Sequence, residues 1–252
     1  MTRLFIILFL GLSPVLFAQE YNKVDSQGRK QGEWRKVHES KNVYEYKGQF
    51  KNDKPVGEFS YFYENGKVKA VVDHGDGSGR AEAFFYHPNG KLMTYGIYTN
   101  LRKDSIWVSF GPSGKLSNTT TYKGDSIHGL QTIYFVPEDP LDKSQIVSET
   151  FQWINGNREG QYNRYFKSGI LMIKGQFENN KREGIWEEFH PNGKRFMLKR
   201  YKNGVQHGWW VVYDENMKRV KEVYYCNGKI LEGEKLDRHL KLLEERGIDP
   251  NG

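Results

Sequence analysis

The chain has 252 residues, a formal net charge of +7, 27 glycines and an aromatic content of 15%. The aromatic residues exclude a disordered chain, the glycines disfavour a helical bundle, and a mean hydropathy of −0.78 excludes a polytopic membrane protein. An all-β protein with many turns and an aromatic core remains.

Residues 1–18 have the pattern of a secretory signal peptide. Arg3 precedes an apolar run at 4–10, and Ala18 offers a small residue at a cleavage site. The uncharged stretch is shorter than the about 20 residues that a membrane-spanning helix needs. We therefore expect an exported protein, periplasmic or extracellular after cleavage; retention of the segment as an uncleaved anchor is the alternative.

From residue 28 to 233, after a lead-in at 19–27, the sequence repeats with a period near 24. An anchor recurs eight times, at spacings of 25, 24, 24, 24, 31, 24 and 24 residues. The anchors are Gly32, Gly57, Ala81, Ser105, Gly129, Gly160, Gly184 and Gly208. Aromatic residues keep fixed distances from the anchor, two and five residues after it and seven before it. We predict that they form the repeat core: Trp34, Phe50, Phe59, Phe62, Tyr86, Tyr98, Trp107, Phe110, Tyr122, Tyr134, Trp153, Tyr162, Tyr165, Phe177, Trp186, Phe189, Tyr201, Trp210 and Tyr213.

Each unit is expected to form a β-hairpin. Turn dipeptides such as Asn65-Gly66 and Asn192-Gly193 separate strand-like segments, and Asn-Gly supplies the positive φ angles of a type I′ turn. A loop such as 202–208 then leads to the next anchor. Because side chains alternate along a strand, the columns two and five after the anchor point to opposite faces unless a bulge separates them. We predict an all-β fold, an elongated single-layer antiparallel meander of about eight β-hairpin repeats.

Two units depart from the period. An insertion at 136–148 adds seven residues before Gly160, and its simplest interpretation is a tolerated surface loop, with a binding loop as the alternative. A loose glycine-rich connection at 73–79 precedes Ala81. Departures from the repeat pattern at Ala81, Ala83, Ser105 and Gln131 indicate that the central units are locally weaker or specialised.

The segment 234–252 predicts a short C-terminal α-helix and a tail. Leu236, Leu240 and Leu243 recur at helical spacing, and Gly247 is a typical stop. Because the last unit of an array leaves an open edge, we interpret the helix as a cap. A partner-binding helix is the alternative.

Two stretches carry the clearest repeat motif, KGQFENNKREGIW at 174–186 and KGQFKNDKPVGEF at 47–59. Both resemble the MORN (membrane occupation and recognition nexus) repeat in its bacterial variant, and the resemblance extends from about residue 28 to 233. It implies an elongated sheet of consecutive hairpins and a role in protein–protein contact, scaffolding or membrane association. Some bacterial relatives are labelled as antitoxins.

The sequence has no pattern that predicts catalysis. Histidines such as His87 and His190 follow the repeat, a lone Cys226 can form no intramolecular disulfide, and no phosphate-binding loop occurs. The adjacent Glu187 and Glu188 point to opposite faces of a strand, so they cannot act as a glycosidase pair. We expect a non-enzymatic protein with no catalytic residues, no cofactor and no metal.

Basic residues in the C-terminal half are the last sequence feature that indicates a binding partner. A candidate patch for an anionic partner comprises Lys194, Arg195, Lys199, Arg200 and Lys202, although such residues also solvate a thin sheet. We predict an interaction or scaffold module in the cell envelope or outside the cell, which binds another protein or an envelope component. Peripheral binding to anionic lipid and an antitoxin-like role are the alternatives, and export disfavours nucleic acid as a partner.

Overall fold

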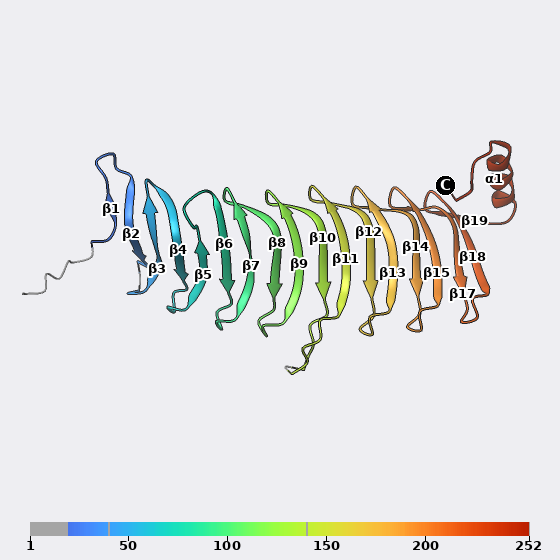
Figure 1. Ribbon diagram of the computed structural model, residues 1–252. Helices are drawn as coiled ribbons and strands as arrows, with labels where there is room; N and C mark the ends of the chain where they lie inside the picture. Colours follow the sequence, from blue (N-terminus) through green and yellow to red (C-terminus); the bar gives the residue numbers. More distant parts are fainter. Residues whose placement is uncertain (1–19, 40, 140, 252) are drawn as a thin grey trace, which may run out of the picture.

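The computed structural model describes residues 20–39, 41–139 and 141–251. These residues form one open antiparallel sheet of 19 strands followed by one helix (Figure 1). Each strand pairs with the next along the chain, so the sheet is a meander; β15 contacts both β16 and β17, which are two parts of one interrupted strand. The predicted fold class is therefore confirmed. The predicted signal peptide lies outside the described residues.

Most strands contain eight or nine residues and are joined by short turns. The strands are β1 (Lys23–Val24), β2 (Lys30–Val37), β3 (Tyr44–Lys51), β4 (Lys54–Phe62), β5 (Val68–Asp73), β6 (Arg80–Tyr86), β7 (Leu92–Thr99), β8 (Arg102–Phe110), β9 (Leu116–Lys123), β10 (Ser126–Tyr134), β11 (Val147–Ile154), β12 (Asn157–Tyr165), β13 (Leu171–Glu178), β14 (Lys181–Phe189), β15 (Arg195–Lys202), β16 (Val205–Gln206), β17 (Gly208–Tyr213), β18 (Arg219–Cys226) and β19 (Lys229–Leu231). Strand β1 pairs with β2, so the sheet begins inside the predicted lead-in at 19–27.

The Asn-Gly turns, which lie at the lower edge of Figure 1, differ from the predicted type I′ turn. At Asn65-Gly66 only the glycine has a positive φ, +79°. The N–H of Gly66 donates to the carbonyl of Tyr63, and the N–H of Tyr63 donates to the carbonyl of Lys67. This is a type I turn followed by a glycine bulge. The type I′ prediction for these turns is wrong, because Asn65 itself stays right-handed.

The type I′ turns lie along the opposite edge of the sheet. Asn52 and Asp53 have φ values of +52° and +64°, and Asn203 and Gly204 have +53° and +83°. Asparagine tolerates this left-handed conformation better than most residues. The predicted return loop at 202–208 is therefore a two-residue turn, and pairing with β15 resumes immediately in β16.

The repeat anchor is the position of a β-bulge. Gly184 has φ +62°, and pairing moves from Gln176 with Glu183 to Lys174 with Glu187, so β14 uses four residues where β13 uses two. The same shift accompanies five other anchors: Gly57, Ser105, Gly129, Gly160 and Gly208. The anchor residue at each of these bulges has a positive φ, which explains why glycine dominates this column.

One face of the sheet, here called the aromatic face, carries the rings of the columns two after and seven before the anchor. Phe177 meets Trp186 edge-on at 5.2 Å between ring centroids, and Tyr98 meets Trp107 at 5.0 Å. Phe50 and Phe59 repeat this geometry at 5.1 Å. Edge-to-face contacts are favourable beyond the area that they bury, so neighbouring units hold one another through rings.

Glycines on the preceding strand make room for these rings. A Cβ atom on Gly48 would lie 2.4 Å from the ring of Phe59, and on Gly96 or Gly175 it would lie 2.3 Å from Trp107 or Trp186. The largest rings therefore lie flat against bare backbone. This packing replaces the second layer that a sheet normally needs on its apolar face.

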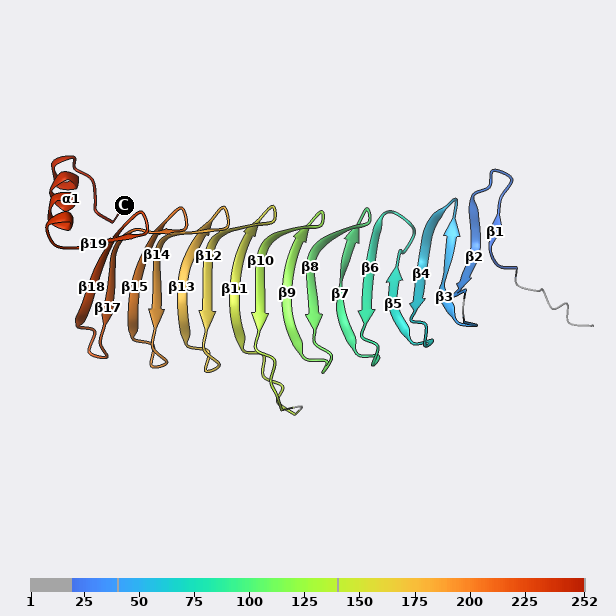
Figure 2. The same cartoon turned by 180° about the vertical axis from the view of Figure 1, so that it is seen from behind.

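Helix α1 (Gly233–Glu245) lies at the C-terminal end of the sheet (Figures 1 and 2). Gly247, with φ +65°, ends it, and the chain turns back to the sheet. There the hydroxyl of Tyr224 donates to the carbonyl of Pro250 at 3.0 Å, and its ring faces that of His239. No residue of α1 is buried, so the contact with the last hairpin is thin. No described helix has the length and apolar character needed to span a membrane.

A hollow in the aromatic face as the candidate functional site

The predicted core aromatics occupy both faces of the sheet. Two positions after the anchor, Phe59, Trp107, Tyr162 and Trp186 are buried, whereas Trp34 and Trp210 are half-buried. The half-buried residues seven before the anchor are Phe50, Tyr98, Tyr122, Trp153, Phe177 and Tyr201. Those five after it are also half-buried and face the other side of the sheet: Phe62, Tyr86, Phe110, Tyr134, Tyr165, Phe189 and Tyr213.

Cations cover the aromatic face in several repeats. Two residues before the anchor, the Lys103 ammonium lies 4.5 Å from the centroid of the Trp107 ring, and the Arg182 guanidinium lies 4.5 Å from that of Trp186. Lys30 covers Trp34 in the same way at 4.7 Å. Such contacts shield the ring faces from water while the charged groups stay solvated.

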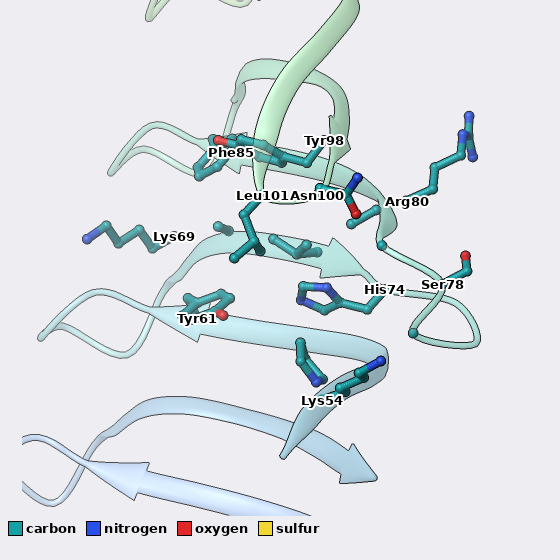
Figure 3. A pocket seen from close by; sticks show the side chains of 16 residues that line it. Lys54, Tyr61, Lys69, His74, Ser78, Arg80, Phe85, Tyr98, Asn100 and Leu101 are labelled. Carbon is teal, nitrogen blue, oxygen red and sulfur yellow. The ribbon is translucent and has the colours of Figure 1, made fainter. Parts of the chain in front are cut away.

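The unit anchored at Ala81 lacks the buried ring, the glycine beneath the ring and the covering cation. Ala83 replaces the buried ring, Val72 replaces the glycine beneath it, and Gly79 replaces the covering cation. Ala81 has no left-handed φ, and β5 pairs with β6 without a shift in register. With the ring, the bulge and the cation all missing, a hollow of about 750 Å³ opens in the aromatic face (Figure 3).

Small side chains form the floor of the hollow, and aromatic side chains form its walls. The floor residues Ala70, Val72 and Ala81 are each less than a tenth exposed. Tyr61 stands on one side, and Figure 3 shows Phe85 and Tyr98 on the other. Leu101, which is 81% exposed, stands at the rim.

The glycine-rich connection at 74–79 closes one end of the hollow. The N–H of His74 donates to the carbonyl of Gly57, and the N–H of Gly57 donates to that of Gly75, both at 2.8 Å. On the far side, the N–H of Asn100 donates to the carbonyl of Gly79 at 2.7 Å. The connection that the sequence marks as loose is therefore bonded to the strands on both sides.

The rim of the hollow is basic. Lys54, Lys69 and Arg80 line it, and none of the described lining residues is acidic. Arg80 pairs with Glu82 at 3.1 Å, whereas the ammonium groups of Lys54 and Lys69 have no hydrogen bond or ion pair with described residues. Anionic groups beside an apolar ligand would therefore meet unpaired positive charge.

Burial favours the neutral forms of one histidine and two tyrosines that line the hollow. The ring of His74 meets Phe59 edge-on at 5.2 Å, and burial lowers the pKa of this histidine. Burial also raises the pKa of the Tyr61 and Tyr98 hydroxyls. The hollow thus offers an apolar floor with neutral polar groups beside it, which suits binding of an apolar group.

The second gap in the aromatic pattern, at Gln131, is filled. Its amide nitrogen donates to the hydroxyl of Thr120, and its amide oxygen accepts a hydrogen bond from the indole N–H of Trp153, both at 3.1 Å. A polar network replaces the ring there. The hollow therefore follows from the combination at Ala81 and Ala83, and the sequence showed the departure without showing its consequence.

The structure separates the basic residues at 194–202. Cross-strand pairing places Lys199 on the face of Trp186, and Arg195 and Arg200 on the opposite face. Arg195 pairs with Glu187, Lys199 with Glu188, the Lys194 ammonium donates to the carbonyl of Glu215, and Arg200 donates to that of Trp209. Lys202 ends β15 at the type I′ edge. These residues do not form one open basic surface.

Within the described part of the chain, no three His, Cys, Asp or Glu side chains gather as metal ligands. Glu187 and Glu188 lie on opposite faces and pair with different cations, as strand alternation requires. Cys226 is half-buried and unpaired.

Comparison with known families agrees with the repeat geometry. Residues 55–73, 81–100 and 182–203 match the family described as the MORN repeat variant. These three segments are variant MORN repeats. The first two matched segments lie on either side of the glycine-rich connection that closes the hollow. No curated protein matches the chain.

Proposed function

We propose that this MORN-repeat protein is a non-enzymatic, exported interaction module that binds another protein through the hollow in its aromatic face. MORN repeats in general mediate contacts with proteins or membranes, which fits a repeat protein of this kind. The observation that carries the proposal is the hollow itself, with its apolar floor, its aromatic walls and two lysines among its lining residues that have no partner among the described residues.

Site-specific photo-crosslinking in cells tests this proposal. A benzophenone amino acid at Leu101 reports on the hollow, and the same probe at Ile185, 52% exposed on the opposite face, is the matched control. We expect an adduct with an identified protein from position 101 and none from position 185. No adduct, or equal adducts from both positions, would contradict binding at the hollow.

Export is the second part of the proposal, supported by the pattern at residues 1–18. Mass determination of the purified mature chain tests it. We expect a protein that begins at Gln19 and is recovered outside the cytoplasm. A full-length cytoplasmic chain would overturn this part and leave the binding site as it stands.

Binding to anionic lipid receives less support, because the basic residues at 194–202 are divided between two faces and pair with acceptors of the chain. Flotation with vesicles rich in anionic lipid separates the two functions. Binding that grows with lipid charge and is lost in moderate salt would favour the membrane instead.

A further inference from the structure

The loop inserted between β10 and β11 exposes an apolar side chain that the repeat architecture does not explain. Figure 1 shows this loop reaching beyond the row of neighbouring turns. Leu141 lies in it with 85% of its surface exposed, next to Glu138, Asp139 and Asp142. We call the described residues 136–139 and 141–145 the acidic loop. A leucine this exposed, with three acidic residues close to it in the sequence, buries little apolar surface within its own molecule.

The acidic loop is nevertheless held in place. The Lys115 ammonium donates to the backbone carbonyls of Asp139 and Asp142. The Asp139 carboxylate accepts the N–H of Leu141 at 2.8 Å, and the Asp142 carboxylate accepts that of Ser144 at 2.7 Å, which lowers the pKa of Asp142. Leu141 is therefore presented outward on an ordered support, which reduces the entropy lost when it binds.

The acidic loop and the hollow have complementary chemistry. One offers an apolar side chain among acidic residues, and the other offers an apolar floor with Lys54 and Lys69 among its lining residues, and these lysines have no partner among the described residues. The loop leaves the lower edge of the sheet in Figure 1, whereas the connection at 74–79 places the hollow toward the upper edge. Strands β8 and β9 also separate them, so the two cannot meet within one molecule.

We propose that Leu141 of one molecule docks in the hollow of a second copy, with its flanking carboxylates against Lys54 and Lys69. This inference rests on the proposed function, because it names the partner of the same site. The two surfaces differ, so the contact is heterologous: it builds open chains unless two reciprocal contacts close a dimer.

Sedimentation velocity over a concentration series tests the contact. We expect the sedimentation coefficient of the wild-type mature chain to rise with concentration. Leu141→Asp, which removes the apolar group, and the double variant Lys54→Glu/Lys69→Glu, which reverses the rim charge, should each lose this rise. All three positions are exposed, so we expect both variants to fold as the wild type does. Val220→Asp and Lys181→Glu/Lys229→Glu make the same changes at other exposed positions and should behave as wild type.

Mixing the two defective variants gives the sharper test. Leu141→Asp keeps an intact hollow, and Lys54→Glu/Lys69→Glu keeps an intact acidic loop. We therefore expect each alone to be monomeric and the mixture to form a 1:1 complex. The inference is overturned if the wild type stays monomeric at the highest soluble concentration, if either defective variant still associates, or if the mixture does not. An adduct of Leu101 with a different protein would overturn only this inference and leave the proposed function standing.

Discussion

The repeats at Trp186 and Ala83 share one hairpin plan and use it differently. In the first, a bulge at Gly184 and a bare backbone at Gly175 let the indole lie flat, and Arg182 covers it. In the second, Val72 and Ala83 take the places of the glycine and the ring, and no bulge forms. The comparison shows that the ring, the glycine beneath it and the covering cation work as a set, and that losing the set leaves a hollow while the meander continues.

The largest expected effect comes from removing the ring of the regular unit. Trp186→Ala should destabilise the protein by about 3–5 kcal/mol, because the buried indole, 2% exposed, contacts rings on both sides. Ala83→Gly in the divergent unit should cost only about 0.5–1 kcal/mol. Chemical denaturation followed by circular dichroism measures both. Equal losses would show that the two units pack alike.

Substitution of the glycine under the ring should cause the second-largest loss of stability. Gly175→Ala should cost about 1–3 kcal/mol, since its Cβ would lie 2.3 Å from Trp186 and the indole must move. Gly111→Ala is the matched control, because its Cβ would meet nothing closer than 3.9 Å and its φ is not left-handed. A neutral Gly175→Ala in the same denaturation assay would show that the ring does not need bare backbone.

The bulge residue should contribute less. Gly184→Ala forces an alanine to φ +62° and should cost about 1–2 kcal/mol. Gly184→Asn should retain most of the stability, because asparagine adopts this conformation readily. Thermal unfolding compares the stability of the two variants. If the alanine variant is as stable as the asparagine variant, the left-handed backbone is not the reason for glycine at the anchor.

The smallest effect is pH-dependent and belongs to the divergent unit. Burial lowers the pKa of His74, so the unfolded chain binds a proton more readily than the folded one. This contribution to stability is fully present above the unfolded pKa of about 6.5, and it is lost as the pH falls from there through the lower pKa of the folded state. Melting temperatures between about pH 7 and pH 5 should therefore fall less in His74→Asn than in the wild type. An identical fall would show that other groups account for the acid sensitivity.

The sequence predicted the repeat, the meander and the positions of the rings, because each was copied along the chain. It misplaced the turn types, because Asn-Gly fits both a type I′ turn and a type I turn with a glycine bulge, and only the pairing of residues such as Tyr63 and Lys67 separates them. The bulge at Gly184 could not be located from spacing alone, since alternation says nothing about register between strands.

The hollow could not be predicted from the sequence, for a different reason. Ala81 and Ala83 could be recognised as departures, but whether a missing ring leaves a space depends on what replaces it. Gln131 shows the other outcome, since its amide takes the place of the ring and hydrogen-bonds to Thr120 and Trp153. The partners of Glu187 and Glu188 were equally hidden, because they come from adjacent strands.

The positions at which Ala83 and Gln131 replace an aromatic ring also affect how cooperatively the molecule unfolds. On the aromatic face, ring contacts among the described residues fall into three runs: the first ends at His74, the second spans Phe85 to Tyr122, and the third begins at Phe151. In an array where each unit touches only its neighbours, cooperativity is carried by such contacts. Hydrogen exchange should therefore report three segments that open with separate free energies, with the boundaries at these two units.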